Sequence, residues 1–199
     1  MGWNDLIDEI QRWEAGDAEA PSRLRDRFER TQTVLVLDMA GFSRLTRQRG
    51  ILHTLAMIHR MRSLCAPQVE SVGGRLLKTE ADNLLAVFPD VERGLRAALG
   101  MNIACAEDAA LRGRSPEEAV RVCIGLGHGP MYDLGDDVFG DEVNLASKLG
   151  EDLAEPGEIL LTRAAADLVP QRLEQHAVET RQTSISGVVV DYVWLATTS

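Results

Sequence analysis

Two residues that could do chemistry lie four positions apart near the middle of the chain. Lys78 carries an amine and Asp82 a carboxylate, on either side of a polar stretch between two short apolar segments. These segments are rich in Leu, Val and Phe, so they predict strands over 75–79 and 84–88 that form a hairpin. Such a turn also forms without any function, because Asp and Asn bond their own backbone and most lysines are solvated. The stretch from Lys78 to Asp82 can therefore be interpreted either as a structural turn or as a binding site.

A further carboxylate follows another strand-length segment. Residues 33–37 form a continuous apolar run, which is typical of strands covered on both faces, and the run ends on Asp38. A helix is expected to start at Ser43. If Asp82 lies at the tip of a neighbouring hairpin, the two carboxylates meet at one end of the sheet, a ligand set that suits Mg²⁺ or Mn²⁺. The alternative is that Asp38 caps the helix.

The elements that must position these residues form one α+β pattern behind a short helical extension. Apolar spacing predicts an amphipathic helix over 3–13, a break over 16–22 and one or two helical turns over 23–30. This extension should cap the main domain, with a regulatory or dimerising role as the alternative. A long helix is expected after Ser43, kinked or ended by Pro67. The other predicted elements are helices over 91–111, 142–153 and 164–168 and strands over 120–126, 158–161, 173–183 and 188–195.

Composition limits the classes of protein that fit. The 199 residues suffice for one domain with a real core, and a second full domain is not expected. A net charge of −10 argues against nucleic acid as the main partner. Three widely spaced cysteines suggest neither a disulfide framework nor a zinc site, which fits a reducing cytoplasm. No apolar run is long enough to span a membrane, and no signal peptide is evident.

A glycine-rich run, 125–129, does not carry a nucleotide-binding spacing. It lacks the GxGxxG pattern, and no Walker A, GxSxG, HExxH or kinase motif is present elsewhere. These glycines are expected to allow close backbone approach at the end of the strand over 120–126. His128 within the run is expected to be structural.

Several separated motifs, taken together, resemble the class III nucleotidyl cyclases. They are VLDMAGF over 36–42, GGRLLKTEADNLLAVF over 73–88 and DVFGDEVNLASK over 137–148, followed by EPGEIL over 155–160. Their order and spacing match the family over about 31–195. The resemblance implies a ferredoxin-like antiparallel sheet core with packed helices. It divides the chain into an N-terminal helical extension, 1–30, and a cyclase homology domain, 31–199.

The resemblance also implies a role for each matching residue. In the family, two Mg²⁺ or Mn²⁺ ions lie at the metal positions, and the loop that opens the next helix offers backbone N–H groups to the triphosphate. A helix-borne asparagine and arginine orient the ribose and stabilise charge on the reacting phosphate. The matching positions are Asp38, Met39 and Asp82 for metal, Ala40, Gly41, Phe42 and Ser43 for the triphosphate, Lys78 and Asp137 for the base, and Asn144 and Lys148 for catalysis.

Hydrogen-bond chemistry favours adenine at the base positions. Adenine presents an acceptor at N1 beside an amino donor at N6. Lys78 has donors only, and an ionised Asp137 has acceptors only. Without the resemblance, Asp137 would be an ordinary carboxylate in an acidic loop. Guanine reverses the pattern and would call for an acceptor at the lysine position, so ATP is the expected substrate.

Three departures from the family pattern bear on activity. Lys148 replaces the arginine, and lysine lacks the planar fork that binds phosphate through two bonds; its alternative role is a surface ion pair with Asp152. Ala81 stands where glycine usually precedes the metal carboxylate, so the turn is expected to avoid a conformation that only glycine tolerates well. The segment 186–188 lacks the lysines that some members place against the triphosphate.

These observations predict an adenylate cyclase that converts ATP to 3′,5′-cyclic AMP and pyrophosphate. By resemblance, the chain would form a cytoplasmic homodimer with shared active sites, requiring neither nucleic acid nor a membrane. One copy would supply Asp38 and Asp82, and the other would supply Lys78, Asp137, Asn144 and Lys148. Two alternatives are a catalytically weak or inactive cyclase-like regulatory module that binds nucleotide, and a cyclase with a different base preference.

Overall fold

The computed structural model describes residues 3–115, 118–171, 178–185 and 188–195. Its strands form one eight-stranded sheet in the order β2-β3-β1-β4-β6-β8-β7, with β5 paired to β4. Every pair is antiparallel except β4 with β6. The predicted α+β class is thus confirmed, with one parallel pair in the sheet. The strands are β1 (Glu29–Met39), β2 (Arg75–Glu80), β3 (Asn83–Phe88), β4 (Val122–Asp133), β5 (Val138–Phe139), β6 (Ile159–Thr162), β7 (Val178–Ile185) and β8 (Val188–Leu195).

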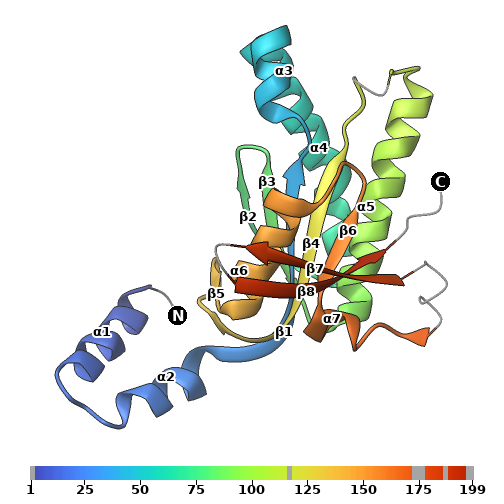
Figure 1. The fold of residues 1–199 in the computed structure, drawn as a ribbon. Helices are drawn as coiled ribbons and strands as arrows, with labels where there is room; N and C mark the ends of the chain where they lie inside the picture. The colour runs from blue at the N-terminus through green and yellow to red at the C-terminus, as the bar shows by residue number, and fades with distance from the viewer. Residues whose placement is uncertain (1–2, 116–117, 172–177, 186–187, 196–199) are drawn as a thin grey trace.

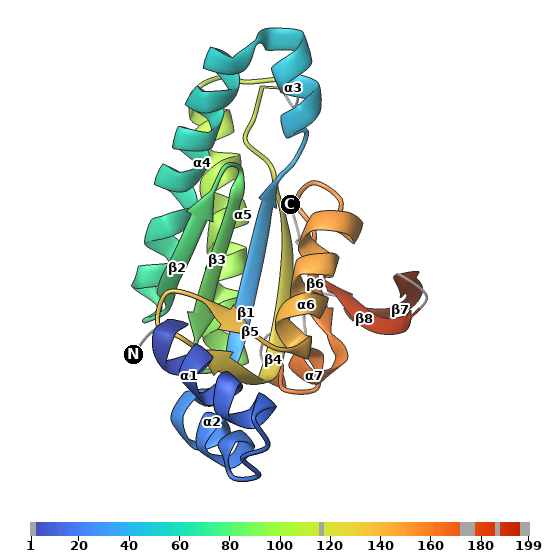
Figure 2. The same cartoon turned by 90° about the vertical axis from the view of Figure 1, so that its left-hand side faces the viewer.

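Helices cover both faces of this sheet (Figures 1 and 2). The long helices α4 and α5 pack on one face, and α6 packs on the other. A π-helical segment, η1, continues directly from α6. The helical segments are α1 (Trp3–Glu14), α2 (Ala20–Phe28), α3 (Phe42–Arg49), α4 (Ile51–Ser71), α5 (Val91–Leu111), α6 (Asp141–Ser147), η1 (Lys148–Leu153) and α7 (Arg163–Ala166). No helix of the described ranges is both long and apolar enough to cross a membrane.

The central strand β1 shows why a continuous apolar run was needed. Alternate residues of a strand point to opposite faces. Leu35 and Leu37 accordingly join the core beneath α4 and α5, whereas Val34 and Val36 join the cluster beneath α6. All four are almost fully buried. The prediction of a strand covered on both faces is confirmed.

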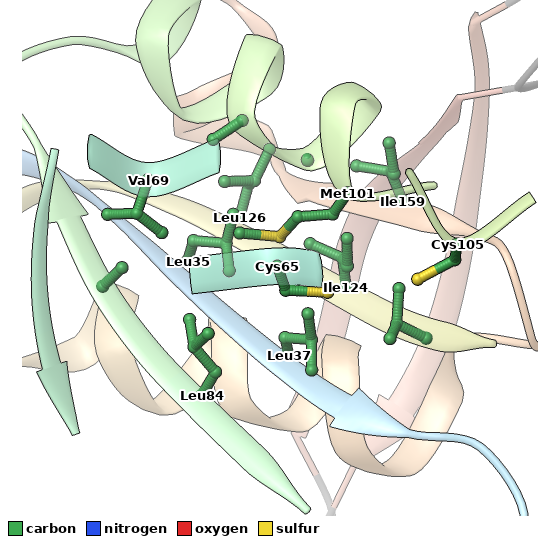
Figure 3. Packing of buried hydrophobic residues seen from close by; sticks show 14 of the residues in the cluster. Leu35, Leu37, Cys65, Val69, Leu84, Met101, Cys105, Ile124, Leu126 and Ile159 are labelled. Atoms are coloured by element: carbon green, nitrogen blue, oxygen red, sulfur yellow. The ribbon is translucent and has the colours of Figure 1, made fainter. Parts of the chain in front are cut away.

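The larger core lies between the sheet and the helix pair α4 and α5 (Figure 3). Cys65 comes from α4 and Cys105 from α5, and both lie among aliphatic side chains such as Leu37 and Ile124. The three cysteines are buried and free of disulfides.

Glycines in β4 allow α6 and η1 to lie directly on the sheet. A Cβ atom on Gly125 would lie 2.0 Å from the Ala146 carbonyl oxygen, and one on Gly127 would lie 2.5 Å from the Glu142 carbonyl oxygen. Close backbone approach is therefore confirmed, but its place was wrong. The strand predicted over 120–126 does not end at these glycines but continues to Asp133. His128 is structural, because its Nδ1 shares a 2.9 Å hydrogen bond with Thr33 Oγ1.

Several predicted boundaries need correction. Pro67 does not end its helix, since α4 continues to Ser71. The helix predicted over 142–153 divides into α6 and η1, and the helical turns predicted over 23–30 begin earlier, at Ala20. Of the strand predicted over 173–183, residues 173–177 lie outside the described part of the chain.

The N-terminal helices dock on the lower end of the sheet (Figure 2). Leu6 of α1 and Phe28 of α2 form a buried cluster with Leu134, which follows β4. Trp3 also contacts Phe139 of β5, with ring centroids 5.3 Å apart in an edge-on arrangement. Capping of the main domain therefore describes their packing, while a domain boundary between residues 30 and 31 stays a prediction.

Candidate functional site

Two of the predicted metal ligands meet where β1 ends. Asp38 pairs in register with Asn83 at the start of β3, and Asp82 precedes that residue at the hairpin tip. The Met39 N–H donates to the Asp82 carbonyl oxygen at 3.1 Å, which ties the tip to the end of β1. Burial, followed by the charges of Asp82 and Glu151, raises the pKa of Asp38 to about 7. Burial likewise raises the pKa of Asp82.

Glu151 of η1 is a neighbouring carboxylate that sequence reasoning missed. Its pKa is raised, mainly by burial and then by Asp152, and Lys148 acts in the opposite direction. Asn83 Nδ2 lies 3.4 Å from its Oε1. In an ordinary α-helix, its spacing of seven residues from Asn144 would place both on one face, and this signal could have identified it.

The carboxylate pair suits a divalent cation that also takes ligands from its substrate. Both charged neighbours that act on the Asp38 pKa are themselves carboxylates, so a bound cation would offset their repulsion. Among the described residues, however, no group of three or more His, Cys, Asp or Glu side chains could hold a metal by itself. Mg²⁺ and Mn²⁺ sites commonly use one or two carboxylates and complete their shell with phosphate oxygens and water.

The hairpin tip contradicts the expectation for Ala81. Glu80 pairs with Asn83, which leaves a two-residue loop. Two-residue hairpin loops normally require positive φ at their first central position, hence the usual glycine. Ala81 adopts φ +46°, the only positive value among the described residues other than glycine. The turn does not avoid the left-handed region, because the strand register imposes it.

The predicted base-reading residues are already paired in the single chain. Lys78 Nζ donates to Asp137 Oδ2 across the space between β2 and the loop before β5. This hydrogen bond is the main reason why the pKa of Lys78 is raised. The other carboxylate oxygen of Asp137 accepts from the Val138 N–H at 2.9 Å, which orients the side chain.

A second basic residue of β2 holds the same loop. Arg75 donates to the Asp133 carboxylate and to the Gly135 carbonyl oxygen. Asp133 Oδ1 in turn accepts from the Gly135 N–H at 2.9 Å. The loop that carries Asp137 is therefore fixed to β2 at two points.

Lys78 and Asp137 line a cavity of about 240 Å³ between the sheet and α6. Its wall combines these polar groups and Glu151 with apolar side chains from β1, β3 and α6. The lining includes Val36, Lys78, Leu85, Asp137, Val143 and Glu151.

The two predicted catalytic residues lie on the exposed side of α6 and η1. Asn144 is exposed within α6, and Lys148 is the first residue of η1. Lys148 Nζ lies 2.8 Å from Asp152 Oδ2, and this hydrogen bond raises the pKa of Lys148. The surface ion pair considered from the sequence is therefore formed. Single-turn π segments inside helices are frequent at functional sites.

The predicted triphosphate loop has only some of its backbone donors available. The Ala40 N–H donates to the Arg121 carbonyl oxygen at 2.9 Å, so it is occupied. Gly41 adopts φ +81° as the N-cap of α3, and the helix begins at Phe42. The N–H groups of Phe42 and Ser43 head this helix, where backbone donors lack partners from a preceding turn. Asp38 does not cap α3, because Gly41 occupies that position.

Comparison with known proteins places this architecture in a family. The model of the adenylate and guanylate cyclase catalytic domain matches residues 27–195. An adenylate cyclase from Streptomyces coelicolor is 29% identical over 159 residues, which cover 80% of this chain and 38% of that protein. The first curated relatives are much longer, and the chain covers between 27% and 38% of their length.

Solved structures agree with the family match. An adenylate/guanylate cyclase/hydrolase from Silicibacter pomeroyi superposes with a TM-score of 0.75 at 25% identity, covering 85% of this chain and 98% of that one. The guanylyl cyclase Cya2 gives a TM-score of 0.69 at 20% identity, covering 84% and 91%. The architecture is the class III nucleotidyl cyclase fold. The chain belongs to the family of adenylate and guanylate cyclase catalytic domains.

Proposed function

We propose that this domain is an adenylate cyclase, which converts ATP to 3′,5′-cyclic AMP and pyrophosphate. The observation that carries this choice is the contact between Lys78 and Asp137 within one cavity. Lys78 facing N1 and Asp137 facing N6 would match adenine, whereas guanine would call for an acceptor at the position of Lys78. The base would enter between the two side chains and exchange their mutual bond for one bond to each.

Asp38 and Asp82, with the neighbouring Met39 backbone, would hold two Mg²⁺ or Mn²⁺ ions. The fit rests on these oxygen donors and on the charges that act on Asp38, which among the described residues come from the carboxylates of Asp82 and Glu151. When bound, such a pair of ions polarises the attacking and leaving oxygens of a phosphoryl transfer. The protein's own contribution is to keep both carboxylates at one end of the sheet and to orient the triphosphate through the N-terminus of α3.

The reaction requires the ribose 3′-hydroxyl to attack the α-phosphorus while pyrophosphate leaves. Asn144 would orient the ribose through its amide, and Lys148 would stabilise negative charge on the phosphate. Both are exposed in the single chain, so each is accessible to a substrate or to a second copy. The chain's residues contribute mainly positioning and charge, the two largest sources of rate in phosphoryl transfer.

We place the active site between two copies of the chain. The cavity of about 240 Å³ is smaller than the roughly 300–1,000 Å³ of typical small-molecule sites. A second copy that supplied Asp38 and Asp82 would enlarge it. A twofold dimer would then contain two equivalent sites, each with metal ligands from one copy and base-reading residues from the other.

A second candidate is a nucleotide-binding regulatory module with weak or no turnover. Two observations favour it: the ion pair of Lys148 with Asp152 and the left-handed Ala81. The ion pair would keep the Lys148 ammonium from binding a phosphate group. The strained turn at Ala81 lies next to Asp82, a proposed metal ligand. Neither feature removes a metal-binding or base-reading side chain, so we retain the enzyme as the main proposal.

Incubation of the purified chain with each of four nucleotides tests the proposal. ATP, GTP, CTP and UTP are supplied separately with Mg²⁺ or Mn²⁺, and each cyclic product is measured at concentrations where the chain is dimeric. We expect cyclic AMP as the main product. Absence of every cyclic product would refute the enzyme and leave the regulatory module, and a preference for GTP would refute only the base assignment.

Replacement of Lys148 by arginine separates the two candidates further. We expect Lys148→Arg to raise the turnover rate by roughly tenfold, because the guanidinium binds phosphate through two parallel bonds. Asp152→Asn is the companion variant, since it releases Lys148 without changing the cation. A rate that falls in Lys148→Arg would show that the local geometry depends on lysine.

A further inference from the structure

An arginine of α4 reaches the tip of the β2–β3 hairpin. Arg62 Nη2 donates to the Ala81 carbonyl oxygen at 2.8 Å and to the Thr79 carbonyl oxygen at 3.2 Å. Thr79 lies near the end of β2, and Ala81 is the first residue of the two-residue loop. One guanidinium therefore binds the backbone on both sides of Glu80, where the strand turns.

The turn that Arg62 binds is the strained one. Ala81 has φ +46°, and a left-handed conformation is unfavourable for any residue with a Cβ. Hydrogen bonds to the carbonyl of Ala81 and to that of Thr79 favour the one orientation of the turn that presents both. The guanidinium is charged, so its hydrogen bonds to backbone carbonyl oxygens are stronger than hydrogen bonds between neutral groups.

The conformation of Ala81 determines where Asp82 lies. Asp82 is the next residue, and its carbonyl oxygen accepts from the Met39 N–H at 3.1 Å, beside Asp38. A change of the Ala81 dihedral angles would rotate this peptide and move the Asp82 carboxylate relative to Asp38. Lys78 precedes the turn by only three residues in the same hairpin, so the base-reading side chain is close to the same support.

We propose that Arg62 is a positioning residue that holds Ala81 in its left-handed conformation and thereby places Asp82 beside Asp38. For its catalytic consequence this inference rests on the proposed function, whereas its structural part stands on its own. Within the described residues, Arg62 Nε is buried without a hydrogen-bond partner. A buried donor left unpaired is costly, so the hydrogen bonds made by Nη2 have to offset that cost.

A double-mutant cycle tests the structural part. Arg62→Met removes the hydrogen-bond donors and keeps an apolar side chain. Ala81→Gly removes the backbone strain that these hydrogen bonds offset. We expect Arg62→Met to lower the melting temperature by about 4 °C in the wild-type background. In the Ala81→Gly background the loss should be larger, by about 1.5-fold or more, because glycine stays at positive φ and loses both hydrogen bonds outright, whereas Ala81 recovers part of the loss by leaving its strained conformation.

Arg60→Met is the matched control. Arg60 lies two residues away on α4 and pairs with Asp108 at 3.8 Å, not with the hairpin. Its melting-temperature loss should be the same with Ala81 or with the Ala81→Gly change. If Arg62→Met does not fold, Arg62→Lys replaces it, since one ammonium keeps the charge but fits the two carbonyls less well.

A binding measurement tests the positioning of Asp82. The Mn²⁺ concentration that half-saturates binding of 3′-deoxy-ATP is determined, since this analogue lacks the attacking hydroxyl and cannot cyclise. We expect Arg62→Met to raise that concentration about tenfold, as for other residues that orient a metal ligand. Ala81→Gly should restore most of the loss, and Arg60→Met should leave the Mn²⁺ requirement unchanged.

The two measurements separate the possible failures. Equal melting-temperature losses in both backgrounds would overturn the role of Arg62 at Ala81, whatever the protein binds. Coupled stability with an unchanged Mn²⁺ requirement would overturn the positioning of Asp82. If the wild-type chain binds no Mn²⁺ with the analogue, the proposed function fails, and the thermal cycle still decides whether Arg62 holds the turn.

Discussion

The two halves of the candidate site differ in how their charges are balanced. Asp38 and Asp82 lie together at the end of β1. Burial and the neighbouring negative charges raise the pKa of Asp38, and burial raises the pKa of Asp82. Lys78 and Asp137, by contrast, are an ion pair of opposite charges. Without a bound cation, repulsion destabilises the carboxylate region. The ion pair of Lys78 with Asp137 is stable by itself, and a ligand would have to replace its hydrogen bond.

This difference indicates that the two regions are prepared in different ways for binding. Metal would relieve repulsion at the carboxylate end, so binding there should stabilise the fold. A base would have to break the bond of Lys78 with Asp137, so the site gains selectivity at some cost in affinity. The comparison can be tested by changing one region at a time.

Removal of Asp38 should have the largest effect. We expect Asp38→Ala to lower cyclase activity at least about 100-fold, because an essential metal ligand is lost. The metal-free protein should not lose stability, since the change removes a half-buried carboxylate on which the charges of Asp82 and Glu151 act. Activity and thermal unfolding are measured together, with Asp167→Ala, a change in an exposed ion pair, as the control. Normal turnover in Asp38→Ala would refute the metal assignment.

A reversal of the base-reading pair should have the next largest effect. The combination of Lys78→Glu with Asp137→Cys removes the donor that faces N1 of adenine and provides an acceptor for guanine. We expect the ratio of kcat/KM values for ATP and GTP to shift towards GTP by about 100-fold. The neighbouring exposed change Asp136→Cys serves as the control. An unaltered ratio would show that these side chains do not read the base.

The Asp38 and Asp82 carboxylates should also make the stability of the metal-free protein depend on pH in a characteristic way. The Asp38 pKa is near 7 in the folded chain and 3.8 at its usual value, so the folded state holds the proton more tightly. Its contribution to stability is complete below pH 3.8 and is lost as the pH rises through about 7. In EDTA, wild-type stability should therefore fall relative to Asp38→Asn between pH 5 and pH 8.

Mn²⁺ provides the complement to that experiment. Its addition at pH 8 should raise the melting temperature of the wild-type protein and leave Asp38→Asn nearly unchanged, because the cation replaces the lost proton. Parallel pH profiles for the two proteins in EDTA would contradict the account of repelling carboxylates.

Much of the fold could be predicted from local patterns. The apolar run that ends on Asp38 and the two segments of the hairpin lie in β1, β2 and β3, as expected. Period and composition were sufficient because each of these strands must bury at least one face. The helix over 91–111 also begins and ends as predicted, with Asp90 as its N-cap.

Other features depend on contacts that no local pattern contains. Ala81 is left-handed because strand register imposes a two-residue loop, although its residue type favours the opposite sign of φ. The π-helical segment after Ser147 was not foreseen, since Leu145, Leu149 and Leu153 recur every four residues and fit an ordinary helix. Arg62 contacts residues 17 and 19 positions away, and only tertiary packing reveals that reach.

The candidate site was found from resemblance more than from spacing. Lys78 and Asp137 are 59 positions apart, and nothing in the local sequence links them. Glu151 was missed because it lies between the matched motifs over 137–148 and 155–160, although helical spacing would have included it. Roles carried over from the family thus supplied the candidate residues, whereas Glu151 and Arg62 required coordinates.

Mixing two inactive variants tests most directly whether the two regions belong to one shared site. Asp38→Ala and Asn144→Ala are each inactivating on this account, but a heterodimer contains one site free of both changes. After subunit exchange at equal concentrations, about half of the dimers are mixed and each has one intact site of two, so we expect about a quarter of wild-type activity. Activity that stays at the level of the separate variants, with mixed dimers demonstrated, would contradict the shared site.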